Sequence, residues 1–297
     1  MKKEEFDSVI KNNLIEVNGR TAFGYELSKT YENYYSKSVF KSFLEEMQQP
    51  CYMDSFERYE NGKGSELKEQ HGRYGKTPPK MASVASSSRF CYLALRDGAQ
   101  CLGSKEPVQF EHECRIKGIS GTAPQLDGYI PDGNIYFEAK CHEIFDNHKI
   151  KMKAQYWDYL YGHNNEFGFA PIEKTDGVEF EIPLSVFGIN KEYSMFDIKQ
   201  FLCHLLGIVS NKEKEESATL VYMFFKPLTD SALIQRQIEE VFKRLEDEIE
   251  NLFDSSPIRE FIKCNNIKIV AIAEFAKIME PLRTQNMIIM ARTEDQK

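Results

Sequence analysis

The sequence predicts an α/β protein with a mixed central sheet flanked by helices. Residues 219–225 (TLVYMFF) and 267–273 (IKIVAIA) are nearly continuous apolar runs of strand length, as expected for strands buried on both faces. Residues 197–209 and 231–253 place apolar side chains at the i, i+3, i+4, i+7 spacing of an amphipathic helix. The two kinds of segment alternate along the chain, which is the pattern of a sheet with helices on its faces.

Three shorter strands precede this alternation. Residues 108–116 (VQFEHECRI) alternate apolar and polar side chains, so they predict a strand with one buried face. Residues 125–130 and 135–141 are two further strands, separated by Pro-Asp-Gly-Asn. Because Asp-Gly between apolar runs is a strong signal for a tight turn, these two strands predict a hairpin.

The N-terminal part is less regular. Residues 36–47 predict a helix, and residues 61–80, rich in Gly, Pro, Lys and Arg, predict an exposed loop. A second helix is expected over 83–95, where a run of serines can cap the first turn. We therefore divide the chain into an N-terminal helical and loop extension, 1–80, and a main domain, 81–297.

The main domain carries an expected insertion at about 146–195. Within it, residues 149–161 predict a helix and residues 178–182 a short strand.

Composition excludes several classes of protein. The 297 residues are 41% hydrophobic and 28% charged, which is typical of a globular chain. No segment approaches the roughly 20 apolar residues of a membrane span, and the charged N-terminus lacks the apolar core of a secretory signal. We expect a cytoplasmic protein that does not bind membranes. The seven cysteines form no CxxC pair, so we expect reduced thiols rather than disulfides or a zinc site.

The hairpin predicts a cluster of charged side chains. With the Asp-Gly pair as a two-residue loop, Asp127 falls opposite Glu138, and Gln125 falls opposite Lys140. Because side chains alternate along a strand, Asp127, Glu138 and Lys140 point to the same face. The other face carries apolar residues and predicts a contact with the core.

This cluster suits a divalent cation. Two opposed carboxylates destabilise a sheet by up to about 1 kcal/mol, and a cation between them removes that repulsion. Mg²⁺ prefers hard oxygen ligands, often one or two carboxylates completed by water and phosphate oxygens. We expect Mg²⁺, with Mn²⁺ as a substitute, and Lys140 as the catalytic base or a stabiliser of charge on a phosphate.

Asp127 followed by Glu138-Ala139-Lys140 on consecutive strands resembles the PD-(D/E)XK nuclease superfamily, which includes restriction endonucleases. The resemblance covers about residues 82–226 and extends to the order of elements, with the insertion interrupting it. It also includes the serine run 86–88 and Phe110-Glu111 on the first strand, a combination found in some restriction-endonuclease-like proteins. The resemblance implies a restriction-endonuclease-like core and a metal-dependent endonuclease acting on DNA, such as a restriction or other defence enzyme.

The resemblance also implies further ligands. Many members carry a metal-binding Glu on the first helix, but residues 82–96 contain no acid. Glu111 and Glu113, on one face of the preceding strand, are the natural substitutes, and the family pattern favours Glu111. Leu126 stands where the family name has Pro, which is common variation.

Weaker candidates for contacts with nucleic acid lie outside the hairpin. Gln200 and His204 are one turn apart on the polar side of the 197–209 helix, which often runs past the active site in related nucleases. Lys149 and Lys151 follow the motif strand and are placed to meet phosphates. The net charge of −8 weighs weakly against nucleic acid as a partner.

Two rival functions remain. The first is a catalytically inactive nucleic-acid-binding or scaffold protein on the same fold, and the second is an RNA or nucleotide hydrolase. A homodimer is plausible, because two copies of one site are the simplest means of cutting both strands of a duplex.

Overall fold

The computed structural model of the chain describes residues 1–16, 28–31, 33–72, 75–99, 102, 106–121, 123–162, 167–169, 177–276 and 287–291. In chain order the helices and strands are α1 (Lys3–Glu16), α2 (Lys37–Met47), α3 (Met53–Glu60), β1 (Gln70–Gly72), β2 (Gly75–Thr77), α4 (Ser87–Leu95), β3 (Gln109–Glu113), β4 (Gln125–Ile130), β5 (Ile135–Lys140), β6 (Ile150–Lys153), α5 (Trp157–Leu160), β7 (Glu179–Ile182), α6 (Ile198–Asn211), β8 (Ala218–Pro227), α7 (Ala232–Asp254), α8 (Ser256–Cys264), β9 (Ile267–Ala276) and β10 (Met287–Ala291).

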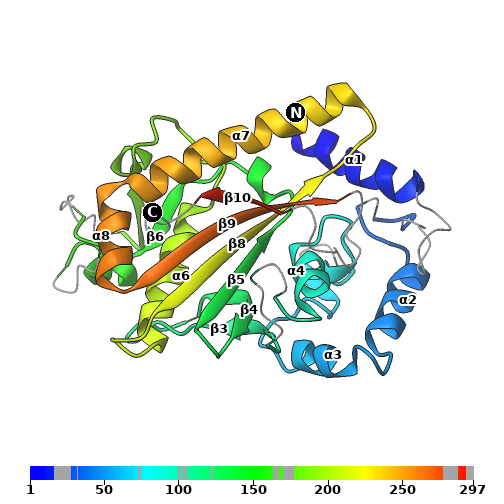
Figure 1. Cartoon of the computed structure of the whole chain (residues 1–297), viewed down its shortest axis with the longest axis horizontal. Helices are drawn as coiled ribbons and strands as arrows, with labels where there is room; N and C mark the ends of the chain where they lie inside the picture. The colour runs from blue at the N-terminus through cyan, green and yellow to red at the C-terminus, as the bar shows by residue number, and fades with distance from the viewer. Residues whose placement is uncertain are drawn as a thin grey trace.

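A six-stranded mixed sheet with the order β10-β9-β8-β5-β4-β3 lies at the centre of the molecule (Figure 1). Strands β5, β8 and β9 are parallel, whereas β3, β4 and β10 join antiparallel at the two edges. Helix α4 packs on one face, where the rings of Phe90 and Phe225 lie 5.7 Å apart. Helices α6 and α7 cover the other face. The predicted mixed sheet flanked by helices is confirmed.

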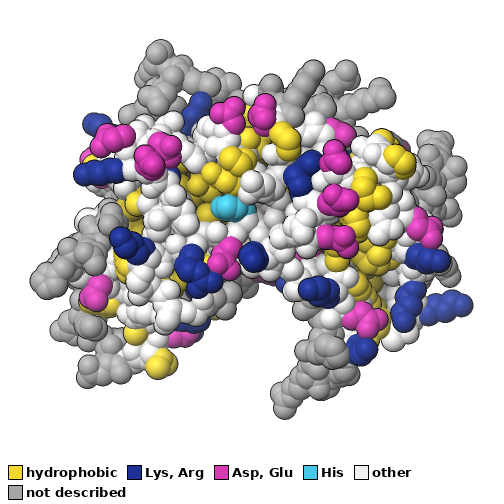
Figure 2. All heavy atoms as spheres, turned by 90° about the horizontal axis from the view of Figure 1, so that it is seen from below, with side chains coloured by type: hydrophobic (Ala, Val, Ile, Leu, Met, Phe, Trp, Pro, Cys, Tyr) yellow, Lys and Arg dark blue, Asp and Glu magenta, His cyan; other side chains and the backbone are white. Residues whose placement is uncertain are grey.

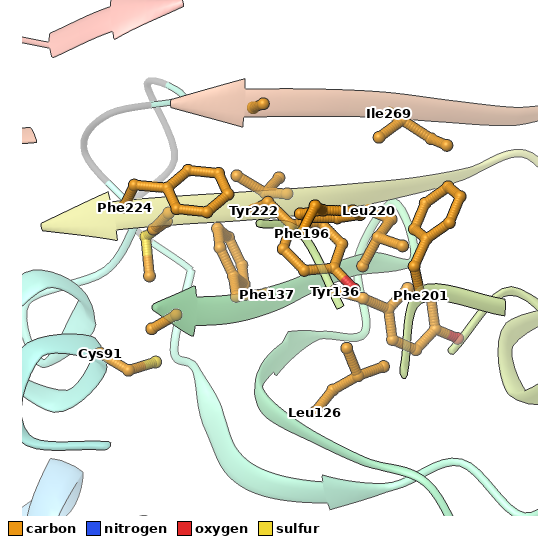
Figure 3. Packing of buried hydrophobic residues seen from close by; sticks show 14 of the residues in the cluster. Cys91, Leu126, Tyr136, Phe137, Phe196, Phe201, Leu220, Tyr222, Phe224 and Ile269 are labelled. Carbon is orange, nitrogen blue, oxygen red and sulfur yellow. The ribbon is translucent and has the colours of Figure 1, made fainter. Parts of the chain in front are cut away.

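The sheet is buried on both faces at its centre. Tyr136, Tyr222, Phe196 and Phe201 pack together between β5, β8 and α6 (Figure 3). Phe137, the next residue along β5 from Tyr136, is buried on the opposite face. A charged side chain on the middle of β5 therefore lies in the interior rather than on an open surface.

The helix starts follow their capping residues. The Ser36 hydroxyl accepts a hydrogen bond from Val39 N at 3.3 Å, and α2 confirms the expected helix. The Ser86 hydroxyl likewise accepts from Arg89 N at 3.1 Å, so α4 begins four residues later than expected. Helix α8 was not predicted.

No helix among the described residues is long and apolar enough to cross a membrane.

The N-terminal extension shares the core of the main domain. Phe6, Phe40 and Phe56 belong to the same buried cluster as Phe90 and Phe110. The expectation that 61–80 is only a loop is wrong in part, because β1 and β2 form a two-stranded ribbon there.

The insertion carries a second ribbon. Strands β6 and β7 pair antiparallel, and the strand expected at 178–182 is confirmed as β7. The helix expected over 149–161 is wrong for its first half. Ile150 and Met152 are buried while Lys151 and Lys153 are exposed, which is the alternation of a strand. Only α5 is helical.

Glu248 of α7 anchors the segment that leads into α6. Its carboxylate, 3% exposed, accepts hydrogen bonds from the backbone N–H groups of Met195 and Phe196 at 2.8 and 2.9 Å. Because Glu248→Ala removes the acceptor of Met195 N and leaves Phe196 N with the Ser194 hydroxyl alone, we expect it to lower the free energy of unfolding by about 2 kcal/mol. Urea denaturation measures this change. Glu250→Ala, at an exposed position on the same helix, should change stability by less than about 0.5 kcal/mol, and equal effects of the two variants would contradict the anchoring role.

Candidate active site

The hairpin forms with the expected register next to its turn. Gly128 pairs with Phe137, Tyr129 with Tyr136 and Ile130 with Ile135. The paired ladder ends at Gly128 and Phe137, one position before Asp127 and Glu138. Instead, the Asp127 carboxylate accepts a hydrogen bond from Ala139 N at 2.7 Å. The side chain of Asp127 thus takes the place of a backbone acceptor and fixes its own position beside β5.

A pocket of about 390 Å³ opens at this end of the hairpin. It contains most of the side chains that the sequence singled out, together with the first turn of α4 and parts of the N-terminal extension. The lining residues that matter below are Glu66, Lys80, Glu111, Asp127, Glu138, Lys140, His142 and Gln200.

Glu138, Lys140 and Gln200 form a closed triangle of hydrogen bonds. The Lys140 ammonium donates to Glu138 Oε1 and to Gln200 Oε1, both at 2.6 Å. Gln200 Nε2 donates to Glu138 Oε1 at 2.9 Å. Glu138 is 4% exposed, so the sheet, α6 and these donors hold its carboxylate away from solvent. Gln200 is therefore placed in the pocket, in contact with the predicted catalytic pair.

Glu111 enters the pocket through an unusual backbone conformation. Its φ of +50° is a left-handed backbone conformation within β3, and of the two acids that the sequence places on one face of this strand, Glu111 lines the pocket and Glu113 does not. Tyr59 OH donates to Glu111 Oε1 at 3.1 Å, and Gly64 lies so close that a Cβ at this position would collide with the Glu111 carboxylate. Glu113 instead pairs with the Arg115 guanidinium at 2.7 Å and does not line this pocket.

Burial and mutual repulsion disfavour the ionised carboxylates. Burial first, and then the charges of Glu138 and Glu111, raise the pKa of Asp127 well above its ordinary value of 3.8. Burial and the nearby Glu66 carboxylate raise the pKa of Glu111 from 4.5 to about 7. Burial alone would lower the pKa of Lys140, but the carboxylates of Glu138, Glu143 and Asp127 outweigh it and raise that pKa. The pocket is therefore acidic around Lys140, and its carboxylates favour the ammonium form of that side chain.

His204 does not lie where the sequence predicts. It is 1% exposed rather than on a polar helix face, because α6 is buried around most of its circumference. Its Nδ1 lies 3.1 Å from Tyr222 OH, and its Nε2 lies 3.8 Å from Glu138 Oε2. Burial lowers the pKa of His204, so the ring is neutral. A buried ring beside Glu138 is placed to support that carboxylate, and the expected contact between His204 and nucleic acid is corrected accordingly.

The two predicted lysine contacts lie elsewhere. Lys149 is near Glu181 and Glu192, at 3.9 and 3.8 Å, on the ribbon of the insertion. Lys151 is exposed on β6. Neither residue lines the pocket that holds Asp127.

Two contacts of the site had no signal in the sequence. Tyr59 and Glu66 come from the extension, and Glu66 Oε1 lies 2.9 Å from Lys80 Nζ at the pocket. His142, which strand alternation places on the face of Glu138, also lines the pocket, two residues beyond Lys140. Periodicity assigns residues to faces of single elements, whereas these contacts depend on how distant segments pack.

A divalent cation fits the chemistry of this donor set. Asp127, Glu138 and Glu111 offer hard oxygen atoms. Burial and then the neighbouring carboxylates raise the pKa values of Asp127 and Glu111, and a cation would remove the repulsive part of this effect. In the described part of the chain, no three His, Cys, Asp or Glu side chains already stand in a complete metal-binding arrangement. The Glu138 oxygen is bonded to Lys140 and Gln200 instead. The chain matches no family model, no curated protein and no solved structure.

Proposed function

We propose that this protein is a Mg²⁺-dependent endonuclease that hydrolyses DNA phosphodiester bonds. The observation that carries the proposal is the convergence of Asp127, Glu138 and Lys140, with Glu111, in one open pocket at the end of a hairpin. The order of strands and helices around this pocket supports a restriction-endonuclease-like core of the PD-(D/E)XK type. The choice of DNA rather than RNA as the substrate rests on this family resemblance.

Each residue then has a role. Asp127, Glu138 and Glu111 would hold Mg²⁺, which when bound polarises a phosphoryl oxygen and lowers the pKa of a bound water molecule. Lys140 stabilises the charge that builds on the phosphate. Its ammonium donates hydrogen bonds to Glu138 Oε1 and Gln200 Oε1, which favours this role over that of the base. Gln200 fixes the positions of Lys140 and Glu138.

A nucleic-acid-binding or scaffold protein that no longer cleaves is the second candidate. It is favoured by the bonding of Glu138 to Lys140 and Gln200, which leaves that carboxylate satisfied without a cation. On the face shown in Figure 2, Lys and Arg side chains are interspersed with Asp and Glu rather than gathered into one basic band. Strong electrostatic binding of DNA phosphates would need such a basic band.

The test is cleavage of plasmid and linear duplex DNA by the purified protein with Mg²⁺, with Mn²⁺ and with EDTA. We expect cleavage that requires the metal and falls at least about a thousandfold in Asp127→Asn. The matched control is Asp132→Asn, in the exposed turn of the same hairpin, where Asn-Gly retains the turn type. That variant should cleave at the wild-type rate.

Thermal shift with Mg²⁺ and Mn²⁺ separates the alternatives. Metal-dependent stabilisation that Asp127→Asn removes, together with cleavage, supports the endonuclease. A protein that neither cleaves nor responds to metal supports the scaffold. Cleavage of RNA but not DNA under the same conditions would overturn the assignment of substrate.

A further inference from the structure

Helix α1 docks against the segment that follows β5. The Lys3 ammonium lies 2.7 Å from Asp146 Oδ1, and the rings of Phe6 and Phe145 are 4.9 Å apart. Next to these contacts, Asp7 Oδ1 lies 2.7 Å from His142 Nδ1, across 135 positions of sequence. Asp7 is 7% exposed, so this pairing is part of a packed interface.

The pairing sets the orientation of the imidazole. A carboxylate oxygen only accepts hydrogen bonds, so His142 Nδ1 must carry the proton that it shares with Asp7. The other ring nitrogen, Nε2, then bears a lone pair. Within the described residues Nε2 has no hydrogen-bond partner. The ring lines the pocket with Lys140 and Glu138 and is 23% exposed.

The other acidic and basic side chains of the described pocket already have partners or proposed roles. Lys140 Nζ donates to Glu138 Oε1 and Gln200 Oε1, and Glu66 Oε1 is paired with Lys80 Nζ at 2.9 Å. Asp127, Glu138 and Glu111 are the proposed metal ligands, and Glu143 Oε2 accepts a hydrogen bond from Cys141 N at 2.6 Å. An imidazole whose far nitrogen is held by a carboxylate is a common arrangement for taking a proton from a nucleophile.

We propose that Asp7 and His142 form a dyad that accepts the proton of the attacking water during phosphodiester hydrolysis. This inference rests on the proposed endonuclease function. The water oxygen forms a bond to phosphorus, the bond from phosphorus to the leaving oxygen breaks, and the water proton moves to His142 Nε2. The leaving oxygen takes a proton from solvent, and His142 later returns its own proton to solvent. The N-terminal extension thus supplies a positioning residue, Asp7, for the reaction.

The first variant is His142→Asn, because the Asn amide can still donate to Asp7 from near the position of Nδ1 while Nε2 is deleted. We expect cleavage of plasmid DNA to fall about a hundredfold while the melting temperature is retained. Asp7→Asn should reduce the rate by at least about tenfold, through loss of the fixed tautomer. The double variant should be no slower than His142→Asn, since both changes disable one unit.

His142→Ala gives a second readout that a structural role would not move. Added imidazole should restore part of its lost rate and should not restore Asp127→Ala. Lys3→Ala is the matched control, because it removes a neighbouring tether of α1 without altering the pocket, and it should cleave at the wild-type rate.

The outcomes separate the two proposals. If wild-type protein cleaves and His142→Asn cleaves as fast, or if Lys3→Ala is as slow as Asp7→Asn, the dyad is overturned while the endonuclease stands. A loss of rate in His142→Ala that imidazole does not repair also counts against it. If the wild-type chain cleaves nothing, both proposals fail.

Discussion

Lys140→Gln should slow DNA cleavage by about a thousandfold, as expected when a preorganised group that stabilises transition-state charge is removed. Among the described residues, Lys140 is the one lysine whose ammonium lies within hydrogen-bonding distance of Glu138. It lies in the same pocket as Asp127. Gln keeps a hydrogen-bond donor near Gln200 but removes the charge. Steady-state cleavage of plasmid DNA at saturating Mg²⁺ measures the effect.

The same substitution should destabilise the metal-free protein. Glu138 is 4% exposed, and without the ammonium its carboxylate loses the charged partner that offsets its burial. Removing one partner of a buried pair typically costs about 3 to 5 kcal/mol. Lys153→Gln, at an exposed position on β6, is the control and should alter neither rate nor stability. A Lys140→Gln protein that cleaves at the wild-type rate would remove Lys140 from the reaction.

The sequence predicted the parts of the fold that follow from local pattern. The Asp132-Gly133 turn fixed the register of Tyr129 and Tyr136, and the apolar run of β8 indicated its burial between β5 and β9. Helix α6 was predicted to within two residues at its end from its periodicity, and the structure shows that Asp197 caps its first turn. These features depend on residues close together in the chain.

The sequence failed where distant segments meet. The position of His204 on the polar side of the predicted helix suggested that this residue is exposed. However, α6 is enclosed between the sheet and the insertion, where it contacts β6. Alternation placed Glu111 and Glu113 together, whereas of the two it is Glu111, with its positive φ, that lines the pocket of Asp127. The contact between Asp7 and His142 joins residues that no periodicity relates. The acidic residues of the hairpin were therefore predictable from the sequence, whereas the surrounding residues that orient them were not.

Glu111→Gln should stabilise the metal-free protein and weaken its response to Mg²⁺. Burial and the Glu66 carboxylate raise the pKa of Glu111 from 4.5 to about 7. Between these values the folded protein holds a proton that the unfolded chain releases, so the free energy of unfolding falls as pH rises through this window. A pKa shift of this size corresponds to a loss of about 3 kcal/mol in the free energy of unfolding. Because Glu111 is coupled to Asp127, we expect the loss at pH 8 to be about 2 kcal/mol.

Gln at this position removes the charge but can still accept the hydrogen bond from Tyr59 OH. Urea denaturation in EDTA, between about pH 5 and pH 8, should show that the variant loses most of the pH-dependent decline of the wild type and is the more stable protein at the upper end. Addition of Mg²⁺ should stabilise the wild type and stabilise the variant less, because the variant lacks one of the oxygen anions that favour the cation.

Glu113→Gln is the matched control, two residues along the same strand. Glu113 pairs with Arg115 at 2.7 Å outside the pocket, so this variant should follow the wild-type pH profile and the wild-type response to Mg²⁺. The pair of variants thereby decides which acid of β3 serves the metal. If Glu113→Gln weakens the response and Glu111→Gln does not, the positive φ at Glu111 has no part in presenting a ligand, and the assignment made from the pocket is wrong. If neither changes it, the cation is held by the hairpin acids without help from β3.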